Sequence, residues 1–140
     1  MMSGDDPTRY VDCEYAAIVQ AESLLRVGKQ GLGRDRPASI WDVQAVSPLA
    51  ALLFAASPRG NDRGIQWVRV AVDNTDPEDV QTPGWAQAAL RCSVAATMSG
   101  QSVVEMLTAA PRHRNSILAA VRTALDALDA TEDQWEQRCG

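Results

Sequence analysis

The segment from Leu49 to Ala56 constrains the fold more than any other part of the chain, because all of its residues are apolar. A helix that is apolar on every side has to be surrounded by other elements, so this segment predicts a central, buried helix. Even with Pro48 included, the run is far shorter than the roughly 20 residues that a membrane span requires. We therefore expect the helix to lie in the middle of a globular domain.

The sequence in front of this run leaves two arrangements open. Ser39 followed by Asp42 resembles an acidic capping box and predicts a helix start. Pro48 then interrupts the helical pattern, because proline has no amide hydrogen to donate. Either one helix from Ser39 to Ala56 is kinked at Pro48, or a second helix starts there with Ser47 as its N-cap.

The rest of the chain carries further helical patterns. Apolar residues at helical spacing predict helices over about 8–27, 62–73, 83–99, 102–110 and 113–130. The signals for their starts are Thr8 or Asp6, Asp62, Thr82 followed by Pro83, and Ser102 with Glu105. The signals for their ends are Gly28, Gly31 and Gly33 for the first helix, Gly100, and Pro111. The strand-forming residues Ile, Phe and Tyr are scarce. The sequence therefore predicts an all-α fold, a compact bundle of about five to seven helices with no sheet.

The 140 residues fit a single domain. We expect residues 1–8 to be a flexible leader or to derive from cloning, residues 9–135 to form one helical domain, and residues 136–140 to be a tail. No basic segment followed by an apolar stretch marks a signal peptide. The three cysteines include no CxxC pair. This usage is typical of a reduced, cytoplasmic protein.

No motif in the sequence predicts catalysis. The pair Gly28-Lys29 is the nearest approach to a phosphate-binding loop, but Ser23 stands where such a loop needs glycine and Gln30 where it needs Ser or Thr. The only histidine, His113, has no orienting acid or nucleophile nearby in the sequence. A zinc site would need further histidines or clustered cysteines. We expect no catalytic, cofactor-binding or metal-binding residue.

The tryptophans and one cysteine are candidates for the core. Trp41 and Trp85 lie in apolar stripes and are expected to be buried, with Trp67 at the edge of the core. Cys92 is expected to be a small buried hydrophobe. Trp135 either folds back onto the body or extends from it, and it is the best candidate for an exposed binding anchor.

The formal net charge is −5, and acidic residues gather in two places. The first is one face of the last predicted helix, with Asp126, Asp129, Glu132, Asp133 and Glu136. The second is the stretch with Asp73, Asp76, Glu78 and Asp79. Each group either offers a negative surface to a basic protein partner or is an ordinary solvated surface.

Direct contact with DNA would need a positive surface that displaces counterions from phosphates. The basic residues that could form one are Lys29, Arg34, Arg36, Arg112 and Arg114. The acidic net charge argues against DNA as the main partner, and no aromatic residues alternate with these to stack on bases. DNA contact therefore stays an alternative to protein binding.

Several stretches together resemble a known family. They are Ser39-Ile40-Trp41-Asp42, the run from Pro48 to Ala56, the stretch Gly64-Ile-Gln-Trp-Val68, and the segment from Arg112 to Leu128. In this order they resemble the all-α domain of coupling proteins from type IV secretion and conjugation, the actinobacterial branch above all. The similarity spans roughly Ser39 to Asp129 and consists of apolar helix patterns with one tryptophan.

The resemblance implies a parent protein that is a membrane-anchored, hexameric ATPase. Its all-α domain would sit on the cytoplasmic side without direct membrane contact and would receive a relaxase, a relaxosome accessory protein or an effector. This chain lacks the motor motifs and the anchor, so it would not catalyse anything itself. Besides this recruitment domain and the DNA-contacting alternative, a stand-alone helical regulator or small enzyme remains a third interpretation.

Overall fold

The computed structural model describes residues 6–31, 40–95 and 100–139, with 27–31, 41–42, 95 and 127–139 described by their backbone alone. These residues form a short 3-10 helix and six α-helices, with no strand among them. The elements are η1 (Pro7–Tyr10), α1 (Glu14–Gly31), α2 (Ile40–Ala56), α3 (Ile65–Ala71), α4 (Trp85–Ala95), α5 (Gln101–Thr108) and α6 (Pro111–Cys139). The prediction of an all-α bundle is confirmed. None of the described helices is long and apolar enough to span a membrane.

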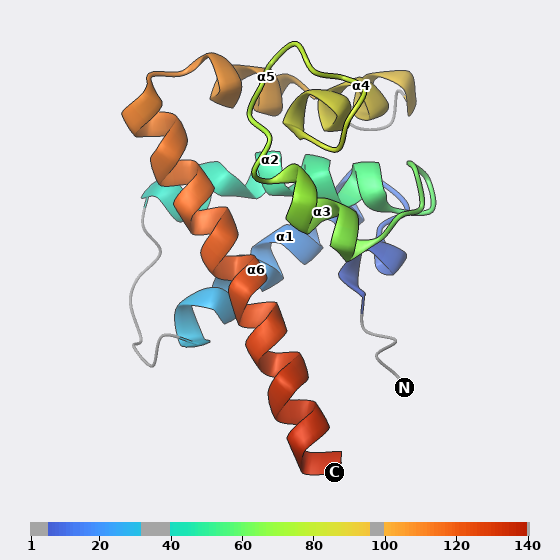
Figure 1. Ribbon diagram of the computed structural model, residues 1–140, viewed down its shortest axis with the longest axis vertical. Helices are drawn as coiled ribbons and strands as arrows, with labels where there is room; N and C mark the ends of the chain where they lie inside the picture. Colours follow the sequence, from blue (N-terminus) through green and yellow to red (C-terminus); the bar gives the residue numbers. More distant parts are fainter. Residues whose placement is uncertain (1–5, 32–39, 96–99, 140) are drawn as a thin grey trace.

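Helix α2 is the centre of the bundle. It contacts all the other helices (Figure 1). In the view of Figure 1, α4 and α5 lie above α2, α1 lies below it, and α6 crosses its left end before running downward. Every residue from Leu49 to Ala56 is at most 1% exposed. The prediction of a central, buried helix is confirmed, and its physical reason is that an all-apolar helix is stable only when neighbours cover every side.

Pro48 lies inside this helix, which resolves the two arrangements that the sequence left open. α2 runs as one element from Ile40 to Ala56, so no second helix begins at Ser47. Pro48 cannot donate a hydrogen bond to the carbonyl of Gln44. Pro48 is itself buried, and the contacts around α2 offset the missing bond.

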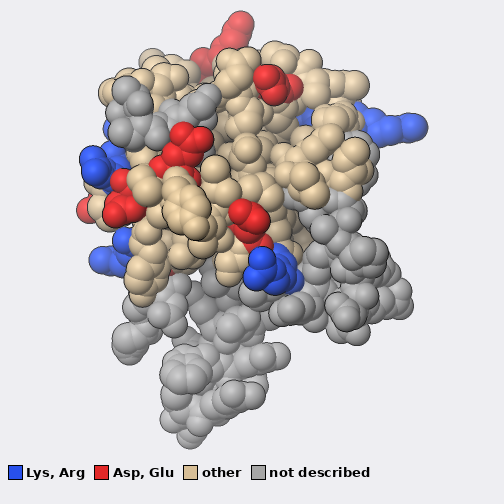
Figure 2. Space-filling model, turned by 180° about the vertical axis from the view of Figure 1, so that it is seen from behind, with Lys and Arg blue, Asp and Glu red and all other residues tan. Residues whose placement is uncertain are grey.

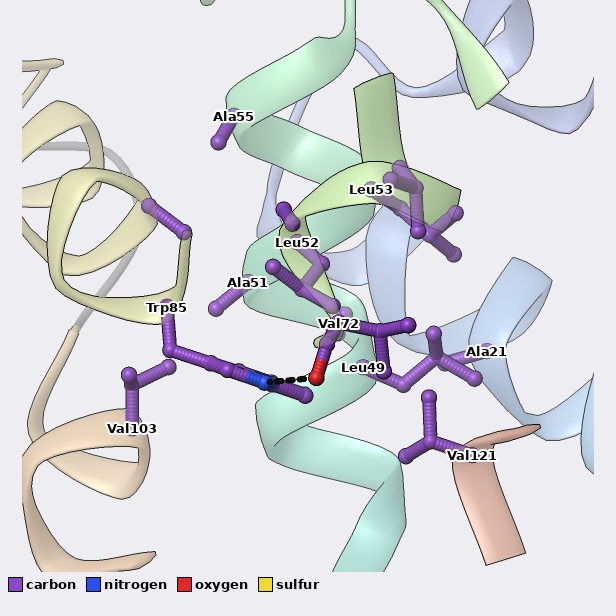
Figure 3. Packing of buried hydrophobic residues seen from close by; sticks show 14 of the residues in the cluster. Ala21, Leu49, Ala51, Leu52, Leu53, Ala55, Val72, Trp85, Val103 and Val121 are labelled. Atoms are coloured by element: carbon purple, nitrogen blue, oxygen red, sulfur yellow. Dashed lines mark hydrogen bonds between the residues drawn. The ribbon is translucent and has the colours of Figure 1, made fainter. Parts of the chain in front are cut away.

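The buried side chains of several helices meet around Trp85 (Figure 3). Its ring is 0% exposed, and its Nε1 donates a hydrogen bond of 3.0 Å to the carbonyl of Val72. Burying an aromatic ring of this size hides about 150–250 Å², which stabilises the fold by about 4–6 kcal/mol at 25 cal/mol per Å². Trp85 is therefore a core residue, as its sequence position predicted. Trp67 is 5% exposed, so it is buried rather than at the edge of the core.

The predicted first helix, from about Thr8 to Val27, is wrong at both ends. The chain forms η1, passes through an extended Val11, and begins α1 only at Glu14. Asp6 caps η1 by accepting a hydrogen bond of 2.9 Å from the amide of Thr8. α1 then continues to Gly31. A glycine inside a helix costs only about 1 kcal/mol, and the packing of α1 against α6 and α2 offsets that cost.

The predicted start of the third helix at Asp62 is also wrong. α3 begins at Ile65, and Asp62 has a φ of 59°, outside the helical range. The N-cap position is Gly64, which has no side chain to offer and a φ of 79°. The carboxylate of Asp6 supplies the cap instead, because its Oδ2 accepts a hydrogen bond of 2.9 Å from the amide of Ile65.

The later helix boundaries differ for similar local reasons. α4 begins at Trp85 and not at Pro83, because the hydroxyl of Thr82 bonds the carboxylate of Asp79 instead of capping a helix. α5 begins after Gly100 and has no side-chain cap, so the capping box of Ser102 with Glu105 is wrong. A Cβ at Gly100 would lie 2.8 Å from the carbonyl oxygen of Ala89, so glycine permits the close approach of the two helices there.

α5 ends at Thr108, so the prediction that Pro111 blocks its continuation is confirmed. Pro111 is itself the first residue of α6, which therefore begins two residues before the predicted start at about His113. The first turn of a helix needs no amide donor, so proline is well suited to that position. α6 runs on to Cys139, beyond the predicted end at about Ala130. Its stripe of Ile117, Leu118, Val121 and Leu125 is buried as predicted. The backbone at Trp135 continues the helix, while the side chains of Leu128 and Trp135 lie outside the described part.

Candidate protein-docking surface

The connection between α3 and α4 is ordered by the side chain of Asn74. Its Nδ2 lies 3.1 Å from the carboxylate of Asp79, 3.2 Å from the hydroxyl of Thr82 and 3.1 Å from the carbonyl of Pro83. Its Oδ1 accepts a hydrogen bond of 3.2 Å from the amide of Asp76. One amide group thus holds the two halves of the loop together.

Asp79 is the second fixed point of this loop. Its carboxylate accepts hydrogen bonds from the hydroxyl and the amide of Thr82, from Asn74 and from the amide of Gln81. These bonds stabilise the charged form, those of Thr82 most, and lower the pKa of Asp79 from 3.8 to about 2. Asp79 therefore stays ionised throughout the physiological pH range.

The ends of the loop are anchored in the core by Trp85. Its ring donates to the carbonyl of Val72, and its amide donates a hydrogen bond of 3.2 Å to the carbonyl of Asn74. Gly84 is buried beside Asn74, where a Cβ would lie 2.5 Å from the Nδ2 atom. The loop is therefore held at both ends and in its middle, and its acidic side chains have a fixed backbone beneath them.

One ion pair connects this loop to α6. Arg122 donates through Nη2 to the Oδ1 of Asp73 over 3.1 Å, with the two side chains 48% and 73% exposed. Asp126, which is also exposed, follows Arg122 by one helical turn and lies on the same side of α6. We use the term acidic surface for the residues Asp73, Asp76, Glu78, Asp79 and Asp126.

The structure thus brings the two acidic groups of the sequence toward each other. Of the predicted face on the last helix, Asp126 is placed and exposed. The backbone of Asp129, Glu132, Asp133 and Glu136 belongs to α6, but their side chains lie outside the described part. The sequence showed the charges of both groups, whereas the ordering role of Asn74 and the link through Arg122 had no signal in it.

The residues proposed for DNA contact are only partly placed. Arg112 is exposed at the start of α6. Arg114 is half-buried, and its Nε is buried without a hydrogen-bond acceptor. Lys29 belongs to the backbone of α1 with its side chain outside the description, and Arg34 and Arg36 lie outside the described residues. No single basic surface can be assembled from the described members of this set.

The described part of the chain offers little for catalysis or metal binding. Cys92 is 0% exposed, and its Sγ lies 3.6 Å from the carbonyl oxygen of Ala51. Burial, and to a lesser degree the charge of Glu14, raises the pKa of this thiol to about 12, so it stays protonated and unreactive. Cys13 is exposed. Among the residues described, no three of His, Cys, Asp and Glu are grouped closely enough to hold a metal ion.

Comparison with known proteins adds no relative to this picture. No family model matches the chain, and neither a curated protein nor a solved structure is significantly similar to it.

Proposed function

We propose that this chain is the substrate-recruitment domain of a coupling protein from a conjugative or type IV secretion system, and that it binds protein cargo without catalysing a reaction. The observation that carries the protein-binding part of the proposal is the ordered acidic surface on the α3–α4 loop and α6. The assignment to coupling proteins is supported by the resemblance of residues 39–129 to their all-α domain.

The stretches that carry this resemblance also belong together in space. Apart from Ser39, which lies outside the described residues, they correspond to α2, to the start of α3 and to the first half of α6. α2 packs against both of the other helices.

The proposed partner is a basic segment of a relaxase, a relaxosome accessory protein or an effector. Asp76 and Glu78 are exposed carboxylates, and a preformed loop loses little conformational freedom when it binds. Opposite charges steer the encounter and are screened beyond about 8 Å at physiological salt. In its parent the domain would face the cytoplasm, away from the membrane, within a hexameric ATPase.

Isothermal titration calorimetry with the relaxase from the same transfer region tests this function. We expect binding at low salt that weakens as salt rises. The double variant Asp76→Asn with Glu78→Gln keeps the side-chain shapes and removes two charges. At about 0.2–1 kcal/mol for each exposed charge contact, it should weaken binding by roughly twofold to thirtyfold.

Glu22→Gln is the matched control, because it removes an exposed carboxylate on α1, outside the acidic surface, and should leave binding unchanged. Absence of binding to relaxase, accessory protein and effector alike, with an intact fold, would refute recruitment. Binding of single- or double-stranded DNA that is lost in Arg112→Ala would favour the DNA-contacting alternative instead.

A further inference from the structure

α3 is too short to be a stable helix by itself. It has seven residues, from Ile65 to Ala71, and isolated helices shorter than about 12–15 residues are marginal in water. Among the described elements it packs chiefly against α2. Its N-cap residue, Gly64, has no side chain and a φ of 79°. The helical state of α3 therefore depends on contacts that other parts of the chain make at its two ends.

The contact at the first end comes from residues 6–11, which we call the N-terminal strap. The Oδ2 of Asp6 accepts a hydrogen bond of 2.9 Å from the amide of Ile65, and a Cβ at Gly64 would lie 2.5 Å from the same oxygen. The strap is packed against the body of the fold, since Thr8 is only 1% exposed. In Figure 1 the dark blue strap lies beside the start of α3. The strap thus caps the end of α3 that has no capping side chain of its own.

The contacts at the other end of α3 belong to the loop of the acidic surface. The amide of Asn74 donates a hydrogen bond of 3.0 Å to the carbonyl of the last residue of α3. Trp85 donates to the carbonyl of Val72, and Arg122 pairs with Asp73 over 3.1 Å. α3 therefore lies between the strap and the loop and is bonded to both.

We propose that the N-terminal strap holds α3 folded and thereby keeps the loop of the acidic surface ordered. In one form the strap is docked, α3 is helical and the loop is fixed. In the other form the strap is released, α3 is unfolded and the loop is free at one end. A contact that stabilises one end of such a unit stabilises the other end by the same free energy. That the strap thereby regulates cargo binding rests on the proposed function, whereas the coupling between strap and loop does not.

The acidic surface is the charged feature that this coupling controls. Seen from behind, in Figure 2, acidic and basic side chains are intermixed among uncharged ones. Asp76 and Glu78, by contrast, are exposed carboxylates on one loop, and their spacing is fixed only while that loop is fixed. Release of the strap leaves these charges in place but allows the loop many conformations. A partner then has to order the loop when it binds, and this ordering costs affinity.

Hydrogen–deuterium exchange of the full chain, followed by NMR at individual amides, tests the coupling without any cargo. Asp6→Ala removes the contact of the strap with α3. Loss of one cap costs about 1 kcal/mol, so the unit formed by α3 and the loop should open about fivefold more often. The amides of Gln81 and Thr82, which donate to Asp79 within the loop, should therefore exchange about fivefold faster, although both lie beyond the far end of α3.

The reverse effect is expected because coupling is reciprocal. Asn74→Ala removes the hydrogen bonds that order the loop and leaves the residues of the strap unchanged. The amide of Ile65, which donates to Asp6, should then exchange at least about fivefold faster. Asp6→Asn keeps the shape of the side chain and one acceptor oxygen, so it serves if Asp6→Ala does not fold. It should accelerate the same loop amides by a smaller factor.

Ile117→Val is the control, because Ile117 is buried on α6, outside the strap and α3, and its truncation costs a similar amount, about 0.5–1.5 kcal/mol. It should leave the exchange of Gln81 and Thr82 unchanged, since these amides exchange through release of the α3 unit and not through global unfolding. Far-UV circular dichroism verifies that each variant stays helical. Unchanged loop exchange in Asp6→Ala overturns the proposal, as does unchanged exchange of Ile65 in Asn74→Ala. A loop that Ile117→Val accelerates as much as Asp6→Ala does also overturns it.

Discussion

Replacing Asp6 by alanine tests the most unexpected contact of the fold, the capping of α3 by a residue 59 positions earlier in the chain. The Oδ2 of Asp6 accepts from the amide of Ile65 over 2.9 Å, and the Oδ1 accepts from the amide of Thr8 over 2.9 Å. One carboxylate thus caps two helices. Asp6→Ala removes both contacts, and it also removes the hydrogen bond of 2.6 Å that Oδ1 accepts from the buried hydroxyl of Thr8.

The magnitude follows from the number of caps. Loss of a capping side chain typically costs about 1 kcal/mol, so the loss of two should cost about 2 kcal/mol. In a domain of this size, that corresponds to a fall in Tm of roughly 6–8 °C. Urea unfolding followed by circular dichroism gives the free energy of unfolding by linear extrapolation.

Asp62 is the matched comparison, because local sequence signals predict that it caps the same helix. Its φ is 59°, and its side chain is exposed. Asparagine adopts this backbone region more readily than most residues, so Asp62→Asn should be neutral within about 0.5 kcal/mol. The reasoning is refuted if Asp6→Ala costs less than about 0.5 kcal/mol, or if Asp62→Asn destabilises the fold as much as Asp6→Ala does.

Three further outcomes follow from the core and the loop. Leu52→Ala should destabilise the fold by about 3–5 kcal/mol in urea unfolding, because Leu52 is 0% exposed and its neighbours leave little room to collapse. The contribution of Asp79 to stability should be present above pH 4 and lost as pH falls toward its folded pKa of about 2. Stability falls with falling pH because the pKa of Asp79 is lower in the folded than in the unfolded state. Asp79→Asn should therefore make the urea midpoint less dependent on pH between pH 4 and 2. Under native conditions iodoacetamide should alkylate Cys13 and spare Cys92, whose pKa is raised to about 12, as peptide mass spectrometry would detect. A flat pH dependence for the wild type would contradict the hydrogen-bonded state of Asp79, and alkylation of folded Cys92 would contradict its burial.

The parts of the fold that the sequence predicts correctly are those determined by side-chain polarity along one element. An all-apolar segment such as Leu49–Ala56 has to be buried whatever surrounds it. The stripe of α6 likewise identifies its buried face from its own residues. These predictions do not depend on which distant segment provides the neighbours, so a single sequence suffices for them.

The predicted helix starts are wrong where the expected capping residue bonds another group, or where a residue distant in the sequence supplies the cap. Thr82 reads as an N-cap, but its hydroxyl bonds Asp79 in the loop. Gly64 has no capping side chain, and Asp6 provides one from the other end of the sequence. Sequence signals for a helix start lie within a few positions of it. They therefore do not reveal a capping residue that folding brings near from a distant part of the chain.

Some features of the candidate site can likewise be predicted from the sequence, and others cannot. The sequence shows that Asp73, Asp76, Glu78 and Asp79 are acidic and close together, which is enough to propose a basic partner. It does not show that Asn74 holds the loop, because an asparagine in a polar stretch has many possible partners. It also does not show that Arg122 reaches Asp73, since these residues are 49 positions apart.

The structure further indicates which charges of the acidic surface are available to a partner. Asp73 is offset by Arg122, an exposed pair worth about 0.2–1 kcal/mol. Asp79 directs its carboxylate at Thr82, Asn74 and Gln81, so its charge is already satisfied within the loop. Asp76 and Glu78 are exposed and have no ion pair with the described residues. The carboxylate of Asp76 accepts one hydrogen bond, of 3.0 Å from the amide of Glu78, whereas that of Asp79 accepts four. A basic cargo segment should therefore depend on Asp76 and Glu78 more than on Asp79, although each of the three carries one negative charge. Calorimetry would detect a larger loss of affinity on removing the charge of Asp79 than on removing those of Asp76 and Glu78. That result would mean that the cargo recognises the shape of the loop and not its free charges.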